Sequence, residues 1–114
     1  MHSVRDIPWR FSSGINAFGI GESKFLKAGM ELHSAQAKLE RASQVKGLTG
    51  VEVNYPTHFR EWTTKDLKAV TESLGLQIAA VNIRFDDPKW RKGAFTNPNA
   101  ALRVEAINLV KSAC

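Results

Sequence analysis

IAAVNIRFDDPKWRKGAFTNPN, residues 78 to 99, is the stretch that decides the predicted fold. Its opening residues form a short apolar run rich in β-branched side chains, which is typical of a buried strand. A loop with aromatic side chains set among charged ones follows. The stretch closes on Asn97 and Pro98, a polar helix cap followed by proline at the first helical position. It therefore predicts a strand over residues 78–83, a long loop and a helix that begins at Asn97.

Two similar units come before this stretch in the chain. A weak strand at residues 10–15 precedes a glycine-rich loop and a helix over residues 34–46 that a serine caps. An alternating strand at residues 51–55 precedes an aromatic loop and a helix over residues 63–75 that opens with the capping pattern Thr-x-x-Asp. A glycine follows the first of these helices and another ends the second. The predicted order is βαβαβα.

This order predicts an α/β fold of three consecutive βα units. Strands that alternate with helices, with short returns from helix to strand, pair in parallel through right-handed crossovers. The long loops all follow the strands, so functional side chains are expected at the carboxyl ends of the strands, in a barrel or in an open sheet alike. A chain of 114 residues suggests one domain at most.

Composition and charge are those of an ordinary globular protein. Apolar residues make up 43% of the chain and charged residues 24%. The net charge is +5, but the sixteen Lys and Arg residues are scattered along the sequence. The densest basic cluster, residues 89–92 around Trp90, lies beside Asp86 and Asp87. We interpret it as a solvated loop, and stacking or pairing with nucleic acid is the less favoured interpretation.

The single cysteine, Cys114, excludes an intrachain disulfide and the paired cysteines of a structural zinc site. No stretch approaches the length of a signal-peptide core or a membrane span. The chain is therefore expected in the cytoplasm, a reducing compartment, without a membrane partner.

Polar side chains near the carboxyl ends of the second and third strands are the candidate binding residues. Asn54 and Asn82 each lie near a strand end. There, an amide side chain can hydrogen-bond a polyol hydroxyl or can equally well satisfy the loop backbone. Arg84 suits a carboxylate or a phosphate, although an ion pair with Asp86 or Asp87 is the favoured interpretation.

The second strand has one apolar and one polar face. Val51 and Val53 point one way, and Glu52 and Asn54 point the other. The polar face would meet water in a two-layer fold and the interior in a closed barrel, and parity alone does not choose between them. We interpret Glu52, in mid-strand, as a buried structural partner for a neighbouring strand.

No complete catalytic constellation is apparent in the sequence. His58 is a lone histidine in a loop, and a metal site needs several convergent ligands. A Ser-His-Asp arrangement and a Gly-x-Ser-x-Gly elbow are both missing. The sequence therefore predicts groups that shape a substrate site, with no catalytic residue and no metal ligand.

Three segments together resemble a known family. They are GLTGVEVNYP at residues 47–56, AVNIRF at residues 80–85 and GAFTNPN at residues 93–99. In this combination they are similar to the N-terminal part of the xylose isomerase-like TIM barrels, which are the sugar isomerases and the sugar-phosphate isomerase/epimerases. The similarity runs from about Phe11 to the C-terminus, and the last segment is fairly specific to one branch.

The resemblance implies a (β/α)8 barrel with a divalent metal (Mn, Mg, Co or Zn) at its C-terminal face. Such enzymes move a carbonyl group between adjacent sugar carbons, so the expected partner is a sugar or a sugar phosphate. The family's metal ligands and acid–base residues come from later strands, and none of them is carried over to this chain. The residues that are carried over lie on the substrate side: Asn54, Tyr55, Asn82, Arg84 and Phe95.

A complete barrel of this type takes about 250 residues. We therefore expect residues 1–114 to form a partial barrel domain of about three βα units, with the C-terminal half absent. Such a fragment would contribute substrate-side loops to an isomerase, would bind no metal by itself and would be inactive alone. Three parallel strands leave two open edges, which predicts self-association or assembly with the missing part.

The alternative hypothesis is a stand-alone basic binding module. The same barrel superfamily includes metal-dependent abasic-site endonucleases, and a net charge of +5 is compatible with binding to nucleic acid. Tight binding that weakens steeply with salt would favour this hypothesis. The scattered positions of the charges argue against it, so nucleic acid is the less favoured partner.

Overall fold

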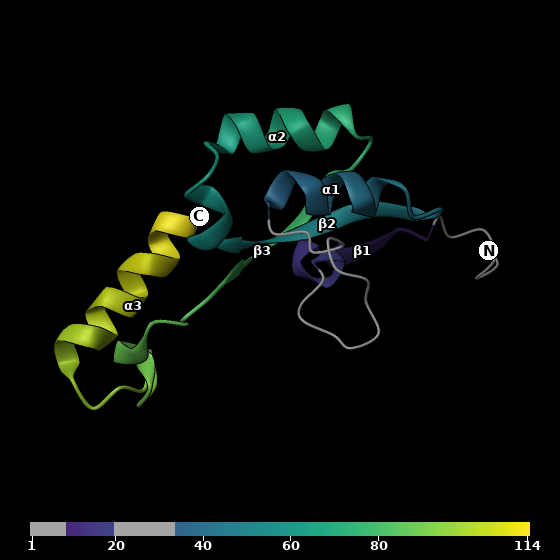
Figure 1. Ribbon diagram of the computed structural model, residues 1–114. Coiled ribbons are helices and arrows are strands. Elements are labelled where there is room, and N and C mark those ends of the chain that lie inside the picture. The colour runs from purple at the N-terminus through teal and green to yellow at the C-terminus, as the bar shows by residue number, and fades with distance from the viewer. Residues whose placement is uncertain (1–8, 20–33) are drawn as a thin grey trace, which may run out of the picture.

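The computed structural model describes residues 9–19 and 34–114, and its centre is a three-stranded parallel sheet (Figure 1). The strands lie in the order β1-β2-β3, so each pairs with its neighbour in the sequence. Their bounds are Phe11–Gly14 for β1, Leu48–Tyr55 for β2 and Gln77–Ile83 for β3. The predicted α/β fold with parallel strands in consecutive βα units is confirmed. The glycine-rich loop predicted after the first strand falls largely outside the described residues.

A helix follows each strand in the described part of the chain, and a short 3-10 turn comes directly or shortly after each strand. The α-helices are α1 (Ala35–Ser43), α2 (Thr64–Ser73) and α3 (Ala100–Ala113). The 3-10 turns are η2 (Ile15–Phe18), η3 (Thr57–Phe59) and η4 (Pro88–Trp90). None of the helices in the described ranges combines the length and the apolar character needed to cross a membrane.

The caps predicted for the first two helices are confirmed. The hydroxyl of Ser34 accepts a hydrogen bond from the backbone N–H of Ala37 at 3.1 Å, and that of Thr63 accepts one from Asp66 at the same distance. Helix α1 ends at Ser43, three residues before the predicted end. Gly47, which follows it, has a φ of +89°, a conformation that side-chain-bearing residues rarely adopt.

The predicted start of the third helix is wrong by two residues. Asn99 is the cap, because its side-chain oxygen accepts a hydrogen bond from the N–H of Ala101 at 2.9 Å. Asn97 is buried, with 3% of its surface exposed, and binds the preceding loop instead. Its Nδ2 donates to the carbonyl of Gly93 at 2.7 Å, and its Oδ1 accepts from the N–H of Asn99 at 2.9 Å. Both groups of the Asn97 amide are thus used to fold the loop, so the helix begins after it.

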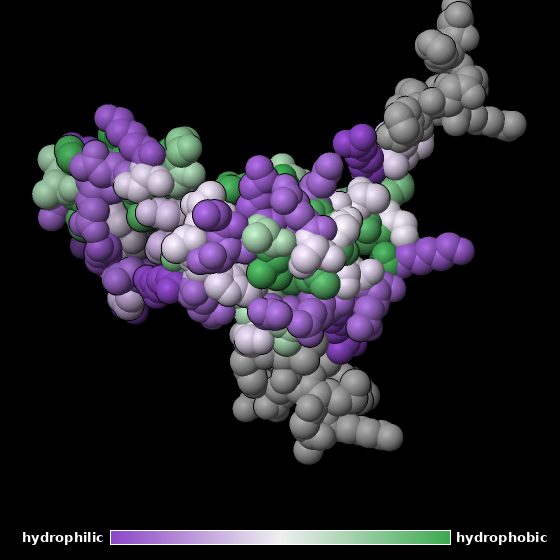
Figure 2. All heavy atoms as spheres, turned by 90° about the horizontal axis from the view of Figure 1, so that it is seen from above, coloured by the Kyte–Doolittle hydropathy of each residue, from purple (hydrophilic) through white to green (hydrophobic). Residues whose placement is uncertain are grey.

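The hydrophobic core lies between one face of the sheet and the helices α1 and α2. Val51 and Val53 project from β2 into this core and are fully buried. The remaining buried members come from η2, α1, α2 and the residue directly before β3: Ile15, Ala35, Leu39, Ala42, Leu67 and Leu76. Figure 2 views the molecule from the side of α2, where hydrophilic side chains cover most of the surface between hydrophobic patches.

Helix α3 lies apart from this core. It runs beside the loop that follows β3, away from α1 and α2 (Figure 1), and none of its residues belongs to the core cluster. Its one fully buried side chain is that of Ala106, whereas Val104 and Ile107 are about half exposed. Two of its leucines, Leu102 and Leu109, are partly buried. Helix α3 and the loop before it therefore form a separate side of the molecule.

Candidate functional site

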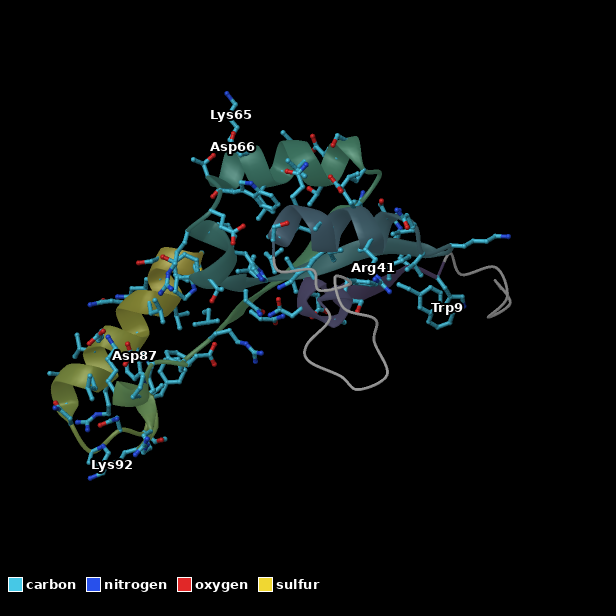
Figure 3. All side chains as sticks on the ribbon, viewed as in Figure 1. Trp9, Arg41, Lys65, Asp66, Asp87 and Lys92 are labelled. Atoms are coloured by element: carbon cyan, nitrogen blue, oxygen red, sulfur yellow. The ribbon has the colours of Figure 1, made fainter. Side chains whose placement is uncertain are left out.

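All three strands point their carboxyl ends toward the same end of the sheet. Figure 3 shows Asp87, in the loop after β3, on this side of the molecule, whereas Trp9 and Arg41 lie toward the opposite end. The loops that follow the strands thus gather where parallel α/β folds carry their ligand sites. The residues predicted from sequence all lie on or after β2 and β3.

A polar row crosses the sheet on the face opposite the core. The carboxylate of Glu52 on β2 accepts a hydrogen bond from the hydroxyl of Ser12 on β1 at 3.5 Å. Its other oxygen accepts one from Nδ2 of Asn82 on β3 at 3.2 Å. The predicted role of Glu52 as a partner for a neighbouring strand is confirmed and extends to both neighbours, although its side chain is only half-buried.

Four of the five predicted substrate-side residues occupy neighbouring backbone positions at the ends of β2 and β3. Asn54 lies directly opposite Asn82 in the register of the two strands, two residues beyond Glu52 on β2. The backbone N–H of Arg84 donates to the carbonyl of Tyr55 at 2.9 Å, so the pairing continues past the last residue of β3. Amide, hydroxyl and guanidinium groups are therefore placed on neighbouring backbone positions.

Phe95 lies in a separate aromatic cluster. Its ring meets that of Phe85 edge-on with centroids 5.5 Å apart, and Phe85 meets Trp90 in the same way at 5.2 Å. Phe95 is 54% exposed at the rim of this cluster, whereas Trp90 is buried. The cluster holds the loop between β3 and α3 together, and Phe95 itself offers an open ring surface.

His58, which the sequence shows only as a lone histidine in a loop, is held in a network of hydrogen bonds that the sequence does not predict. It lies in η3, is only 4% exposed, and its Nδ1 accepts a hydrogen bond from the backbone N–H of Asn54 at 2.8 Å. Because Nδ1 accepts, it carries no proton, and the neutral ring must carry its proton on Nε2. That Nε2–H donates to Oδ1 of Asn16, 3.3 Å away. His58 thus joins the chain after β1 to the chain at the end of β2.

The charge around His58 favours its neutral form. Lys38 on α1 donates from Nζ to the same Oδ1 of Asn16 at 3.0 Å. Burial lowers the pKa of His58 below its ordinary value, and the nearby positive charge of Lys38 lowers it further, against a weaker opposing effect of Glu61. A neutral histidine keeps the Nδ1 lone pair that holds the Asn54 backbone in place.

The ion pair favoured for Arg84 does not form with either aspartate. Asp87 instead caps η4, since its Oδ1 accepts from the N–H of Lys89 at 3.0 Å. The Lys89 ammonium pairs with Glu105 on α3, and this hydrogen bond raises the pKa of Lys89. Asp87 is therefore engaged in capping η4 and Lys89 in its pair with Glu105, and the Arg84 side chain is exposed.

The described residues do not fit a divalent metal. Within residues 9–19 and 34–114, no group of three or more His, Cys, Asp or Glu side chains lies close enough to hold an ion. His58 has both ring nitrogens engaged, and the Glu52 carboxylate already accepts two hydrogen bonds. The amide, hydroxyl and guanidinium groups at the strand ends can hydrogen-bond a hydroxylated ligand.

In comparisons with known proteins, no family model matches the chain, and no curated protein is significantly similar to it in sequence.

Proposed function

We propose that the chain forms the substrate-side wall of a xylose isomerase-like (β/α)8 barrel and holds a sugar at the carboxyl ends of β2 and β3. In this proposal Asn54, Asn82 and Arg84 hydrogen-bond sugar hydroxyls, and Tyr55 and Phe95 border the site. The chemical step, the movement of a carbonyl between adjacent carbons, belongs to metal and acid–base groups that the described residues do not supply.

The observation that carries this proposal is the polar row on the sheet. Ser12, Glu52 and Asn82 come from three successive strands and face away from the core, on the side that becomes the interior when parallel strands close into a barrel. A carboxylate with fixed hydrogen-bond donors on both sides is a favourable lining for such an interior, because each polar group already has a partner. Asn54 and Asn82 continue this lining toward the strand ends.

The sheet edges are consistent with closure by further strands. Among the described residues, β1 and β3 each pair with β2 alone, so each has one edge without a partner strand. Such edges present unpaired backbone donors and acceptors. We propose that these edges pair with further strands, either those of the remainder of a barrel or those of a second copy of the chain.

Binding of D-xylose to the intact chain tests this proposal. The dissociation constant, measured by a ligand-observed NMR titration, is expected to rise about fivefold in Asn82→Ala, as the loss of one neutral hydrogen bond predicts. Gln77→Ala is the matched control, because Gln77 has the same amide group on the same strand at its amino end. An Asn82→Ala chain that binds D-xylose as tightly as the Gln77→Ala chain would overturn the proposal, as would a native chain that does not bind it.

A further inference from the structure

A groove of about 590 Å³ lies between three segments that are far apart in the sequence. The segments are η3 with the residues around it, the loop from the end of β3 through η4, and the second half of α3. Six ionisable side chains line it: Arg60, Arg84, Asp86, Asp87, Lys89 and Glu105. Arg84 is the one predicted substrate-side residue among them.

The charges of this groove balance. Three of its ionisable side chains are cations and three are carboxylates. Lys89 and Glu105 neutralise each other across the groove, and Asp87 is engaged in capping η4. A groove with no net charge offers little attraction for a dianion such as a phosphate ester, because the field of the two arginines is offset by nearby carboxylates.

The groups left to contact a ligand include both donors and acceptors. Within the described part of the chain, no hydrogen bond or ion pair engages the side chains of Arg60, Arg84, Asp86 or Asn108. The two guanidinium groups donate, the Asp86 carboxylate accepts and the Asn108 amide does both. These donors and acceptors together suit a ligand with several hydroxyl groups, because each hydroxyl can both donate and accept a hydrogen bond.

One wall of the groove is apolar. Trp90, which is 8% exposed, lines it together with Leu109 of α3. The indole is held by the edge of Phe85, and the Lys89 ammonium lies 5.1 Å from its centroid. A ligand that carries C–H groups on one side and O–H groups on another suits this groove, because the C–H groups can pack against the aromatic wall while the O–H groups contact the polar side chains.

We propose that this groove binds an uncharged polyol, namely an unphosphorylated sugar or its linear polyol form, and does not select a sugar phosphate. This inference rests on the proposed function, because it specifies the substrate class and adds Asp86, Trp90 and Asn108 to the residues that contact it. Arg84, two residues beyond Asn82, belongs to both the strand-end site and the groove.

The test compares an uncharged and a phosphorylated probe on the intact chain. D-xylose and D-ribose 5-phosphate are titrated separately, with inorganic phosphate as a third probe. D-xylose is expected to bind at least as tightly as D-ribose 5-phosphate. In Asp86→Ala, D-xylose is expected to bind about tenfold more weakly, the loss typical of one hydrogen bond to a charged group. Glu72→Ala is the control, since Glu72 is an exposed carboxylate on α2, outside the groove.

The outcomes separate this inference from the proposed function. Tighter binding of D-ribose 5-phosphate, or of inorganic phosphate, than of D-xylose would overturn the uncharged-ligand assignment. If Asp86→Ala binds D-xylose as the Glu72→Ala control does, while Asn82→Ala weakens binding, the groove assignment fails and the strand-end site stands. If D-xylose binds nowhere on the chain, both fail.

Discussion

His58 Nδ1 accepts a hydrogen bond from the backbone N–H of Asn54 at 2.8 Å, so a buried imidazole fixes the backbone of a proposed substrate-binding residue. The same ring donates from Nε2 to Asn16, to which Lys38 also donates. Three segments are therefore joined through one neutral histidine. Protonation of Nδ1 removes the acceptor and breaks the bond to Asn54.

This relationship predicts a loss of stability at mildly acidic pH. The pKa of His58 is lowered in the folded state from an ordinary value of 6.5, so the unfolded chain binds the proton more tightly. The free energy of unfolding should fall as pH drops from about 6.5 through the lowered pKa, and His58 should contribute no further change below it. Urea unfolding at a series of pH values measures this slope.

His58→Gln is the comparison chain, because glutamine does not titrate. The difference in the free energy of unfolding between the native chain and this variant should change with pH between the folded-state and the unfolded-state pKa of His58. It should be constant at pH values well above the unfolded-state pKa. Parallel pH profiles for the two chains would show that His58 does not link protonation to folding.

Glu52→Ala is expected to destabilise the fold by about 1–2 kcal/mol, because it removes the acceptor for Ser12 and Asn82 on the two neighbouring strands. Glu40→Ala serves as the control: Glu40 accepts only a hydrogen bond from Gln36 on the exposed face of α1, and its loss should cost less than about 0.5 kcal/mol. Urea unfolding measures both, and equal losses would mean that the polar row contributes nothing to the sheet.

Leu67→Ala tests the position of the core. Leu67 of α2 is fully buried against the sheet, so its truncation is expected to cost about 2–5 kcal/mol. Val104→Ala on α3 should change stability by no more than about 0.5 kcal/mol, since Val104 is 57% exposed. A large loss in the Val104 variant would place α3 against the core, contrary to the fold described above.

The two asparagines around Pro98 should respond differently to truncation. Asn99→Ala removes the cap of α3 and is expected to cost about 1 kcal/mol, with faster amide hydrogen exchange confined to the first turn of the helix. Asn97→Ala removes two hydrogen bonds of a buried side chain and should cost about 1–3 kcal/mol. Exchange should then rise through the whole loop from Gly93. If Asn97→Ala instead affected only the first turn of α3, and Asn99→Ala affected the loop, Asn97 would be the helix cap.

Local signals in the sequence predicted much of the fold. The caps at Ser34 and Thr63 and the alternation of Val51 with Glu52 depend on residues within a few positions, and the structure confirms each. The start of α3 was misplaced because two asparagines flank Pro98, and only the loop contacts of Asn97 decide between them.

The site was less predictable because its contacts are distant in the sequence. His58 and Asn16 are 42 residues apart, and no spacing rule joins them. The residues that α3 contributes to the groove, such as Asn108, depend on the helix lying beside the loop after β3. The proximity of Asn54 and Asn82 was the exception, because parallel strands bring their carboxyl ends together.

The most direct test of sugar binding at the strand ends is a chemical-shift map of the ¹⁵N-labelled chain titrated with D-xylose. We expect saturable shifts for the amides of Asn54, Tyr55, Asn82 and Arg84, with much smaller changes at the amino ends of β2 and β3, near Leu48 and Gln77. Shifts confined to those amino ends, or no saturable shifts anywhere in the chain, would contradict sugar binding at the strand ends.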